Sequence, residues 1–360
     1  RCTIINDIKS GFLETKRGVP QGGIISPILF LIYINDLPLA TEMLTLLFAD
    51  DSNFLIHGKS LEEIIPKVNL EMKKICDWFR LNELSIHPEK TKFMIFNKKE
   101  SSIKWEDITI NLDFNNEGNN DKNLIKKLGY INSESDVPAV KFLGIYLDSK
   151  LNFEYHIKYI QKKISTSLFV INRVKKLLNE KSLKTLYTSL IHSHLEYGII
   201  IWTSCSTVSY LQPLIKIQKK AIRIISNSLY NAHTAKLFKK YKILPLNELA
   251  MYNKIIFIYD FLTNKLPDSF QGMWKKNNEI YQNRRSQRID NGDKFYIPFN
   301  NIKSIEKFPL YYYQKLWNDI CDNALLNTQL RKNRFKTTLK TFLFIDVTTI
   351  CSKPNCSECN

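Results

Sequence analysis

The sequence predicts an α+β protein whose strands are concentrated before residue 150 and whose helices follow it. Before residue 150, short runs rich in β-branched and aromatic residues are separated by turns that contain Asn, Asp and Gly. After it, apolar residues recur every three or four positions, which is the spacing of one helix face. Apolar residues make up 44% of the 360 residues, which indicates a sizeable folded core rather than a disordered chain.

The N-terminal elements are predicted to be hairpins around one helix. Residues 1–16 are expected to form a short hairpin or a pair of loops. Ser26 and Pro27 suit the N-cap and the first position of a helix that ends near residue 36. Residues 44–56 predict a strand, a turn at 49–52 and a second strand.

A long amphipathic helix is predicted over residues 61–79, followed by a strand at 92–96. Ser60 and Glu63 form a possible capping box at its start. Pro66 lies inside the pattern, and since proline disrupts a helix interior, the helix is expected to begin or kink there.

The rest of the chain changes from loop and strand to helix. Residues 113–137, rich in Asn, Asp, Glu and Gly, are predicted to be a long surface loop inserted in a hairpin, whose strand returns at 140–147. Apolar helix faces are then predicted at 157–171, 183–191 and 211–225, and a fourth helix is predicted at 246–262. No internal repeat of fixed period is present in the sequence.

The charge of the chain favours a polyanionic partner. The net charge is +17, from 52 Lys and Arg against 35 Asp and Glu. Basic residues that neutralise phosphates release counterions, so nucleic acid is the first expectation. The alternative is a basic surface that serves solubility alone.

The cysteines and the apolar runs indicate in which cellular compartment the protein is expected. Seven Cys scattered over a long chain do not suggest a secreted disulfide framework, so we expect an intracellular protein of the nucleus and cytoplasm. The longest apolar run, residues 28–34, is too short to cross a bilayer, so no membrane partner is expected. Cys351, Cys356 and Cys359 hint at zinc, although three ligands are fewer than a closed structural site needs.

Phe48-Ala49-Asp50-Asp51 is the strongest local signal of chemistry. Two adjacent carboxylates at a hairpin tip repel each other unless a cation lies near them. Hard divalent ions such as Mg²⁺ prefer oxygen ligands of this kind, and a pair of such ions can promote phosphoryl transfer. The alternative is an ordinary turn, because Asp supports turns by hydrogen-bonding its own backbone.

A glycine-containing loop precedes the predicted helix at Ser26. Gly22 and Gly23 would let the backbone approach a nucleotide or template closely, with the helix N-terminus nearby to favour phosphate. Gln21 offers a donor and acceptors to base or sugar edges. The segment is equally compatible with a plain loop before a helix.

Several motifs, in order, resemble one family. Residues 17–22 and 26–38 are similar to the segment before the catalytic hairpin in reverse transcriptases of non-LTR (LINE-type) retrotransposons. Phe48-Ala49-Asp50-Asp51 follows at that family's spacing. Further motifs of the family, and of the region after the polymerase in its jockey-like branch, resemble residues 84–92, 142–145, 189–198 and 218–223. The resemblance covers about residues 1–225, and more loosely extends to about 345.

Two departures from the family pattern are visible. Gly22-Gly23 stands where the family usually has Gly-Ser, and residues 24–27 are similar to group II intron reverse transcriptases. The region after the polymerase decides for the non-LTR branch. His87 stands where the family usually has Asn.

The resemblance implies an architecture and an activity. It implies a partial right-hand polymerase palm of antiparallel sheet and helices at 1–150, a helical thumb-like region at 151–228, and a helical C-terminal region with a polar, Cys-containing tail at 229–360. The implied reaction is RNA-directed DNA synthesis, which extends a DNA 3′-hydroxyl on an RNA template. It would use deoxynucleoside triphosphates and Mg²⁺, with Mn²⁺ as a substitute. The oligomeric state stays open.

The resemblance also assigns roles to residues. Asp50 and Asp51 would be metal-binding catalytic residues, and Lys90 would assist the leaving pyrophosphate as a general acid. The expected nucleotide and template site consists of Gln21, Gly22, Gly23, Phe48 and Ala49, and the expected primer grip consists of Phe142, Leu143 and Gly144. Basic residues of the thumb-like region would track phosphates: Lys158, Lys162, Lys163, Arg173, Lys175, Lys176, Lys184, Lys219, Lys220 and Arg223. Solvated helix faces are the alternative for these residues.

The family's first catalytic motif, with its own Asp, is expected upstream of residue 1, as are the fingers. We therefore expect this chain to be a C-terminal fragment that is inactive alone, because misplacing the attacking hydroxyl costs on the order of 100-fold or more. The rival hypothesis is a truncated transposon remnant that acts as a nucleic-acid-binding or interaction module.

Overall fold

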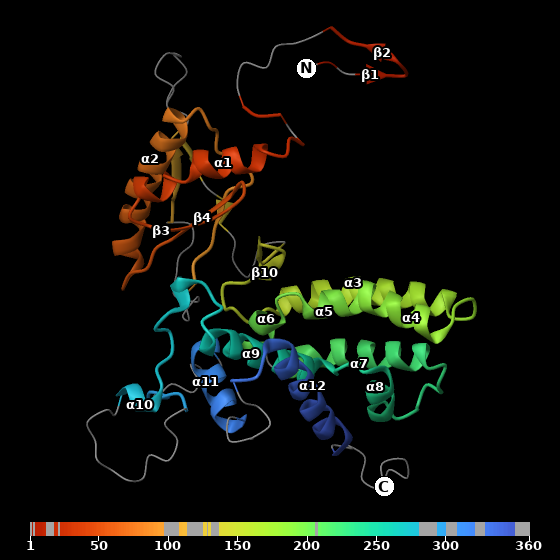
Figure 1. Ribbon diagram of the computed structural model, residues 1–360. Helices are drawn as coiled ribbons and strands as arrows, with labels where there is room; N and C mark the ends of the chain where they lie inside the picture. The colour runs from red at the N-terminus through yellow and green to blue at the C-terminus, as the bar shows by residue number, and fades with distance from the viewer. Residues whose placement is uncertain are drawn as a thin grey trace. The chain divides into compact units, whose positions relative to one another are not determined.

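The structure, a computed structural model, is a mixed helix and sheet protein, as the sequence predicts (Figure 1). It describes residues 2, 4–11, 18–20, 22–96, 108–113, 125–127, 129–130, 137–205, 208–280, 294–299, 308–320 and 328–349. The chain forms two compact units, Arg1–Ile131 and Asn132–Asn360. Among the described residues, no helix combines the length and the apolar character that crossing a bilayer requires.

The first unit contains short strand pairs around two helices. Its elements are β1 (Ile4–Ile5), β2 (Ile8–Lys9), α1 (Ser26–Ile34), the 3₁₀ helix η1 (Leu37–Ala40), β3 (Leu44–Phe48), β4 (Asp51–Leu55), α2 (Leu61–Leu81), β5 (Lys92–Phe93), β6 (Asn111–Asp113), β7 (Ile125–Lys127) and β8 (Gly129–Tyr130). β1 pairs with β2, β3 with β4 and β6 with β7, all antiparallel, whereas β5 and β8 are parallel. The hairpin expected within residues 1–16 is therefore present.

α2 supplies most of the core of this unit. Its apolar face packs against β6 and η1, and the buried cluster consists of Met43, Met72, Ile75, Cys76, Ile110 and Leu112. The Ser60 side chain accepts a hydrogen bond from the Glu63 amide at 3.3 Å, so the predicted cap forms. Pro66 lies inside α2 and does not delay its start.

The structure differs from three local expectations in this unit. Ser26 is inside α1 rather than its N-cap, which is Ile25, and the Ser26 hydroxyl donates instead to the Pro20 carbonyl at 2.7 Å. The loop between β3 and β4 has two residues rather than four, because Asp51 already pairs with Phe48. The segment 113–137, expected to be a loop, contains β7 and β8.

The second unit is mainly helical. Its elements are β9 (Val140–Phe142), β10 (Ile145–Leu147), α3 (Glu154–Val174), α4 (Glu180–Tyr187), the π-helix η4 (Thr188–His192), α5 (Ser193–Glu196), α6 (Ile199–Cys205), α7 (Val208–Ile225), α8 (Ala235–Tyr241), α9 (Leu246–Leu262), the 3₁₀ helix η5 (Asp268–Phe270), α10 (Asn277–Ile280), α11 (Pro309–Ile320) and α12 (Lys332–Thr349). The predicted strand at 140–147 is therefore a hairpin, because Leu143 and Gly144 both adopt positive φ.

One continuous core joins these elements. Buried side chains from Ile145 to Leu343 form a single cluster that includes residues of β10 and of helices up to α12. α3 packs along α7, while α9 contacts α6, α11 and α12. The unit boundary at 131/132 differs from the sequence boundary at 150, because Ile145 of the β9–β10 hairpin packs into this helical core.

Gln218 is the buried polar centre of that core. Its side chain is fully buried, and its amide donates to the Tyr187 hydroxyl at 3.0 Å and to the Leu244 carbonyl at 3.1 Å. Its side-chain oxygen accepts from the Leu246 amide at 2.9 Å. A buried amide must be hydrogen-bonded to be tolerated, and here its bonds fix where α9 begins relative to α4 and α7.

Candidate active site

The β3–β4 hairpin presents the paired carboxylates. Phe48 pairs with Asp51, so Ala49 and Asp50 alone form the connecting loop. Ala49 has a φ of 51°, a left-handed conformation that costs a residue with a Cβ roughly 1 kcal/mol. Strain of this kind collects at functional sites, where the surrounding structure maintains it.

Both carboxylates are exposed. Asp50 lies at the tip of the hairpin, and Asp51 opens β4 on the face that also carries Phe48. Phe48 is 61% exposed, so an aromatic ring stands beside the acids in solvent. Within the part of the chain that the structure describes, neither carboxylate takes part in a hydrogen bond or ion pair. Their oxygens are available to a cation.

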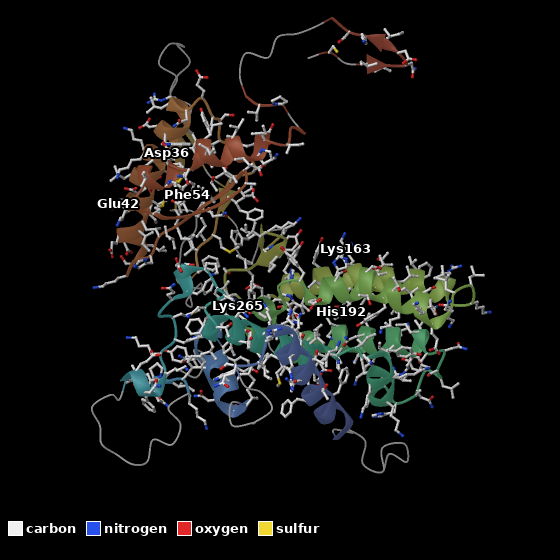
Figure 2. All side chains as sticks on the ribbon, in the orientation of Figure 1. Asp36, Glu42, Phe54, Lys163, His192 and Lys265 are labelled. Atoms are coloured by element: carbon white, nitrogen blue, oxygen red, sulfur yellow. The ribbon has the colours of Figure 1, made fainter. Side chains whose placement is uncertain are left out.

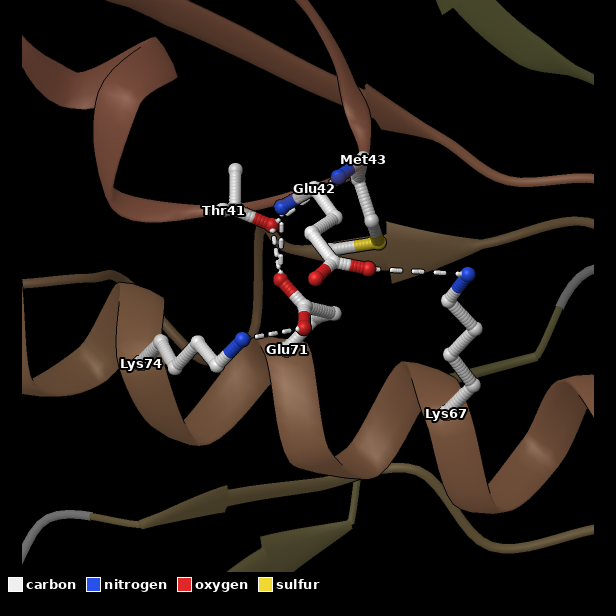
Figure 3. A network of polar contacts seen from close by, with 6 residues as sticks. All are labelled: Thr41, Glu42, Met43, Lys67, Glu71 and Lys74. Carbon is white, nitrogen blue, oxygen red and sulfur yellow. Dashed lines mark hydrogen bonds and ion pairs between the residues drawn. The ribbon is translucent and has the colours of Figure 1, made fainter.

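A carboxylate on α2 fixes the start of this hairpin (Figure 3). Glu71 is 1% exposed, and one of its oxygens accepts hydrogen bonds from the Thr41 hydroxyl and the Glu42 amide, both at 2.7 Å. Its other oxygen pairs with the Lys74 ammonium at 2.6 Å. Glu71 therefore ties the segment that enters β3 to the helix beneath it.

The electrostatics of Glu71 follow from these contacts. Burial alone would raise the pKa of the carboxyl group. The hydrogen bonds from Lys74, Thr41 and the Glu42 amide, together with the charge of Lys74, outweigh burial and lower the pKa to about 2. No local sequence pattern indicates this role, because Glu71 looks like one more polar residue of an amphipathic helix.

The glycine loop before α1 is a tight turn. The Gly23 amide donates to the Pro20 carbonyl at 3.3 Å, and the Ser26 hydroxyl bonds the same carbonyl. Gly22 has a φ of +86°, which a residue with a side chain would strain to adopt. A Cβ on Gly23 would lie 2.6 Å from the Ser26 hydroxyl oxygen, so both glycines are required by geometry. Gln21 lies outside the described residues.

Lys90 lies in a turn. Its amide and that of Thr91 both donate to the His87 carbonyl, at 3.2 Å and 3.0 Å, and the Thr91 hydroxyl reaches the same atom at 2.9 Å. The Lys90 side chain is exposed. His87 therefore serves this turn through its backbone, which explains how a His is accommodated there.

A second tight hairpin, β9–β10, carries Phe142, Leu143 and Gly144. The Tyr197 hydroxyl donates to the Leu143 carbonyl at 2.5 Å. A Cβ on Gly144 would meet the Tyr197 ring at 3.2 Å, and one on Gly198 would meet the Ile145 side chain at 2.4 Å. The pair Tyr197-Gly198 therefore seats this turn against the start of α6, a contact that the sequence motifs did not disclose.

Comparison with known proteins decides the family. Residues 2–147, which include the glycine loop, both carboxylates and the β9–β10 turn, match the family described as "Reverse transcriptase (RNA-dependent DNA polymerase)". Residues 2–147 belong to the reverse-transcriptase family.

Individual relatives of this chain come from non-LTR retrotransposons. It is 23% identical, over 68% of its length and 25% of the relative's, to the RNA-directed DNA polymerase from mobile element jockey of Drosophila melanogaster. It is 23% identical, over 56% of its length and 19% of the relative's, to the Pol polyprotein of the type-1 retrotransposable element R1 of Bradysia coprophila. A further R1 relative, from Nasonia vitripennis, is 27% identical over 43% of this chain and 40% of its own length.

These matches extend beyond the family segment but not to whole proteins. The chain spans about a quarter of the length of the curated relatives that it matches first. No solved structure matches it. The jockey, BS and X-element relatives confirm the resemblance to the jockey-like branch that the motifs indicate.

The donor atoms of the Asp50 and Asp51 side chains fit a divalent metal. Asp50 and Asp51 offer oxygen ligands, free of competing partners, as Mg²⁺ prefers. Among the described residues, no group of three or more His, Cys, Asp or Glu side chains gathers at one point. Cys351, Cys356 and Cys359, the candidate zinc ligands, lie outside the described residues.

Proposed function

We propose that this chain is part of an RNA-directed DNA polymerase that extends a DNA 3′-hydroxyl along an RNA template. The observation that carries the proposal is the exposed Asp50-Asp51 pair, on a strained two-residue hairpin, within a segment of reverse-transcriptase sequence. The RNA template, the DNA primer or target, and deoxynucleoside triphosphates are the proposed partners and substrates. The net charge of +17 supports polyanionic partners.

Asp50 and Asp51 are the proposed metal ligands. Mg²⁺, or Mn²⁺ in its place, would supply charge neutralisation for the attacking and leaving oxygens. The rigid hairpin keeps the two carboxylates in a fixed relation, and Glu71 holds the strand that carries it. Lys90 is the proposed donor of a proton or positive charge to the leaving pyrophosphate.

The remaining site residues position nucleic acid. In the proposal, Gln21, Gly22 and Gly23 line the template and nucleotide site together with Phe48 and Ala49. The exposed Phe48 ring is suited to contact a base or sugar. Phe142, Leu143 and Gly144 are the proposed primer grip, on a turn whose shape Tyr197 maintains.

The proposed architecture assigns the elements up to residue 150 to a palm and the helices α3 to α7 to a thumb. The basic residues of α3 and α7 support this assignment, because they lie on helices whose apolar faces are buried. The exposed ones among them would follow the phosphates of template and primer.

Primer extension tests the proposal. The chain is joined to the upstream polymerase segment of its jockey relative and incubated with an RNA template, a DNA primer, deoxynucleoside triphosphates and Mg²⁺. Extension is expected, and Asp50→Asn is expected to reduce it by on the order of 100-fold or more. Asp77→Asn, which removes a half-exposed carboxylate on α2 that pairs with Arg80 at 2.9 Å, is the control and should leave extension unchanged.

Two outcomes would contradict the polymerase assignment. Extension that is indifferent to Asp50→Asn would place the metal site elsewhere. Absent extension with retained RNA binding would favour the rival hypothesis of a binding module.

A further inference from the structure

A basic pocket lies among the C-terminal helices of the second unit, and none of its lining residues belongs to the proposed polymerase site. α8, α9 and α12 enclose a space of about 430 Å³. Its lining includes Lys239 and Lys242 from the end of α8 and Lys336 and Lys340 from α12. Tyr252 of α9 and Phe344 of α12 supply aromatic walls.

These four lysines carry the same charge, and none of them forms an ion pair among the described residues. No carboxylate described here lies within ion-pair distance of any of them. Other lysines on the same helices differ: Lys240 pairs with Glu180 at 3.1 Å, and Lys332 pairs with Asp260 at 2.6 Å. Lys240 and Lys332 are therefore neutralised by carboxylates, whereas the four lysines that line the pocket form no ion pair among the described residues.

The grouping of lysines disfavours the charged form of Lys340. Its partial burial, followed by the nearby charges of Lys184 and Lys242, lowers the pKa of its ammonium group. Glu196 acts in the opposite direction but does not reverse the effect. An anion in the pocket would relieve both the burial of the charge and the repulsion between the cations.

The adjoining helix is irregular where it faces this charge. The α4–α5 helix contains the π-helix Thr188–His192, and π-turns are frequent at functional sites. The His192 ring, labelled in Figure 2, is partly buried, and its Nε2 atom lies 3.5 Å from Glu196. Burial, and then the charge of Lys340, lowers the pKa of His192 against the opposing effect of Glu196.

We propose that this pocket binds a phosphate of single-stranded nucleic acid, with the adjoining base against Tyr252 and Phe344. Lysine ammonium groups bind phosphate as point charges, and aromatic walls stack on bases without regard to sequence. The space of about 430 Å³ is partly open to solvent and lies in the size range of small-molecule pockets, so it has room for a single nucleotide.

The first experiment measures strand binding by the full chain. The probe is a fluorescently labelled single-stranded RNA of uridines, followed by anisotropy over a range of salt concentrations. The pocket variant is Lys239→Gln with Lys336→Gln, which leaves the half-buried Lys340 in place. The control is Lys236→Gln with Arg334→Gln, which removes the same charge from α8 and α12 at exposed positions that do not line the pocket.

The pocket variant is expected to bind about tenfold more weakly near 100 mM salt, and its log–log salt slope should be shallower by about 1.4, since each lost contact to single strands contributes about 0.7. The control variant should stay within about twofold of the parent. Equal losses in the two variants would reduce the effect to general surface charge and overturn the proposal. No loss in the pocket variant would overturn it as well.

A second experiment identifies the source of the phosphate. Acylation of Lys336 and Lys340 is followed by mass spectrometry with the RNA, with inorganic pyrophosphate, or with a nucleoside triphosphate. Protection by micromolar RNA but not by millimolar pyrophosphate or nucleotide supports a strand. Protection by the small molecules at equal or lower concentration would assign a free polyphosphate site instead, and protection by none would exclude the pocket. Neither experiment requires Mg²⁺ or DNA synthesis. A negative result would therefore count against the pocket proposal and not against the polymerase proposal.

Discussion

The two units of this chain differ in how completely they bury their apolar residues. In the first unit, α1 is apolar along its length, yet Ile34 is its only buried residue in the described structure, and Leu31 is 52% exposed. In the second unit, one core runs from β10 to α12, and Leu339 is fully buried within it. Because buried apolar area stabilises a fold, we expect the second unit to be the more stable one. The hairpin that presents the carboxylates packs on the smaller core of the first unit.

A matched pair of leucine truncations should show the largest contrast. Leu339→Ala opens a cavity in the second unit and should destabilise it by about 2–5 kcal/mol. Leu31→Ala removes the same atoms from an exposed site and should change stability by less than about 0.5 kcal/mol. Urea unfolding of both variants measures the effects. Similar losses would break the comparison between the units.

Acid should separate the units. His156 is buried with its Nδ1 accepting from the Tyr146 amide, and burial lowers its pKa from 6.5 to about 4. The neutral ring is favoured in the fold, so its contribution is complete above pH 6.5 and is lost as the pH falls toward 4. The loss should reach about 2–3 kcal/mol in the second unit. His156→Gln should flatten this dependence in unfolding measured at pH 7 and pH 5.

Glu71 predicts that the first unit loses stability at a lower pH than the second unit does. Its pKa is lowered from 4.5 to about 2, so its contribution is complete above pH 4.5 and is lost as the pH falls toward 2. Glu71→Gln should destabilise the first unit by about 2 kcal/mol at pH 7, because a charged hydrogen-bond acceptor is removed from buried donors. Thermal unfolding across pH 3 to 7 tests this, and a loss confined to pH 5–6 would contradict it.

Tyr197→Phe should have a smaller and local effect. The variant loses the bond to the Leu143 carbonyl while it keeps the ring against Gly144, so a cost of about 1 kcal/mol is expected. Faster hydrogen exchange at the β9–β10 amides, with unchanged exchange in α9, would confirm it. Uniformly faster exchange throughout the second unit would point to a global role instead.

Ala49→Gly should have the smallest effect and the opposite sign. Glycine adopts the φ of 51° without strain, so the β3–β4 hairpin should gain about 0.5–1 kcal/mol. Slower hydrogen exchange at the Phe48 and Asp51 amides measures the gain. Faster exchange would show that the alanine methyl group makes a contact that outweighs the strain.

The elements predicted best are those specified by local periodicity. The apolar face expected at 157–171 lies in α3, where Ile157, Ile164 and Ile171 are buried at the predicted spacing. The strand expected at 140–147 failed, because its reversal at Leu143-Gly144 depends on Tyr197, far away in sequence. The Asp50-Asp51 pair was recognisable from adjacent residues and family spacing. Glu71 was not, since Thr41 and Glu42 are brought to it by the fold.

The two-residue loop at Ala49-Asp50 has an evolutionary consequence. Side chains alternate between the faces of a strand, so a slip of one residue in the pairing of β3 with β4 would turn Asp51 to the opposite face of the ribbon. The face that carries Phe48 would then lose the Asp51 carboxylate. Substitutions can accumulate around this tip, but a change of pairing register removes the carboxylate from that face in one step, so the register is the property that descendants of this sequence must keep.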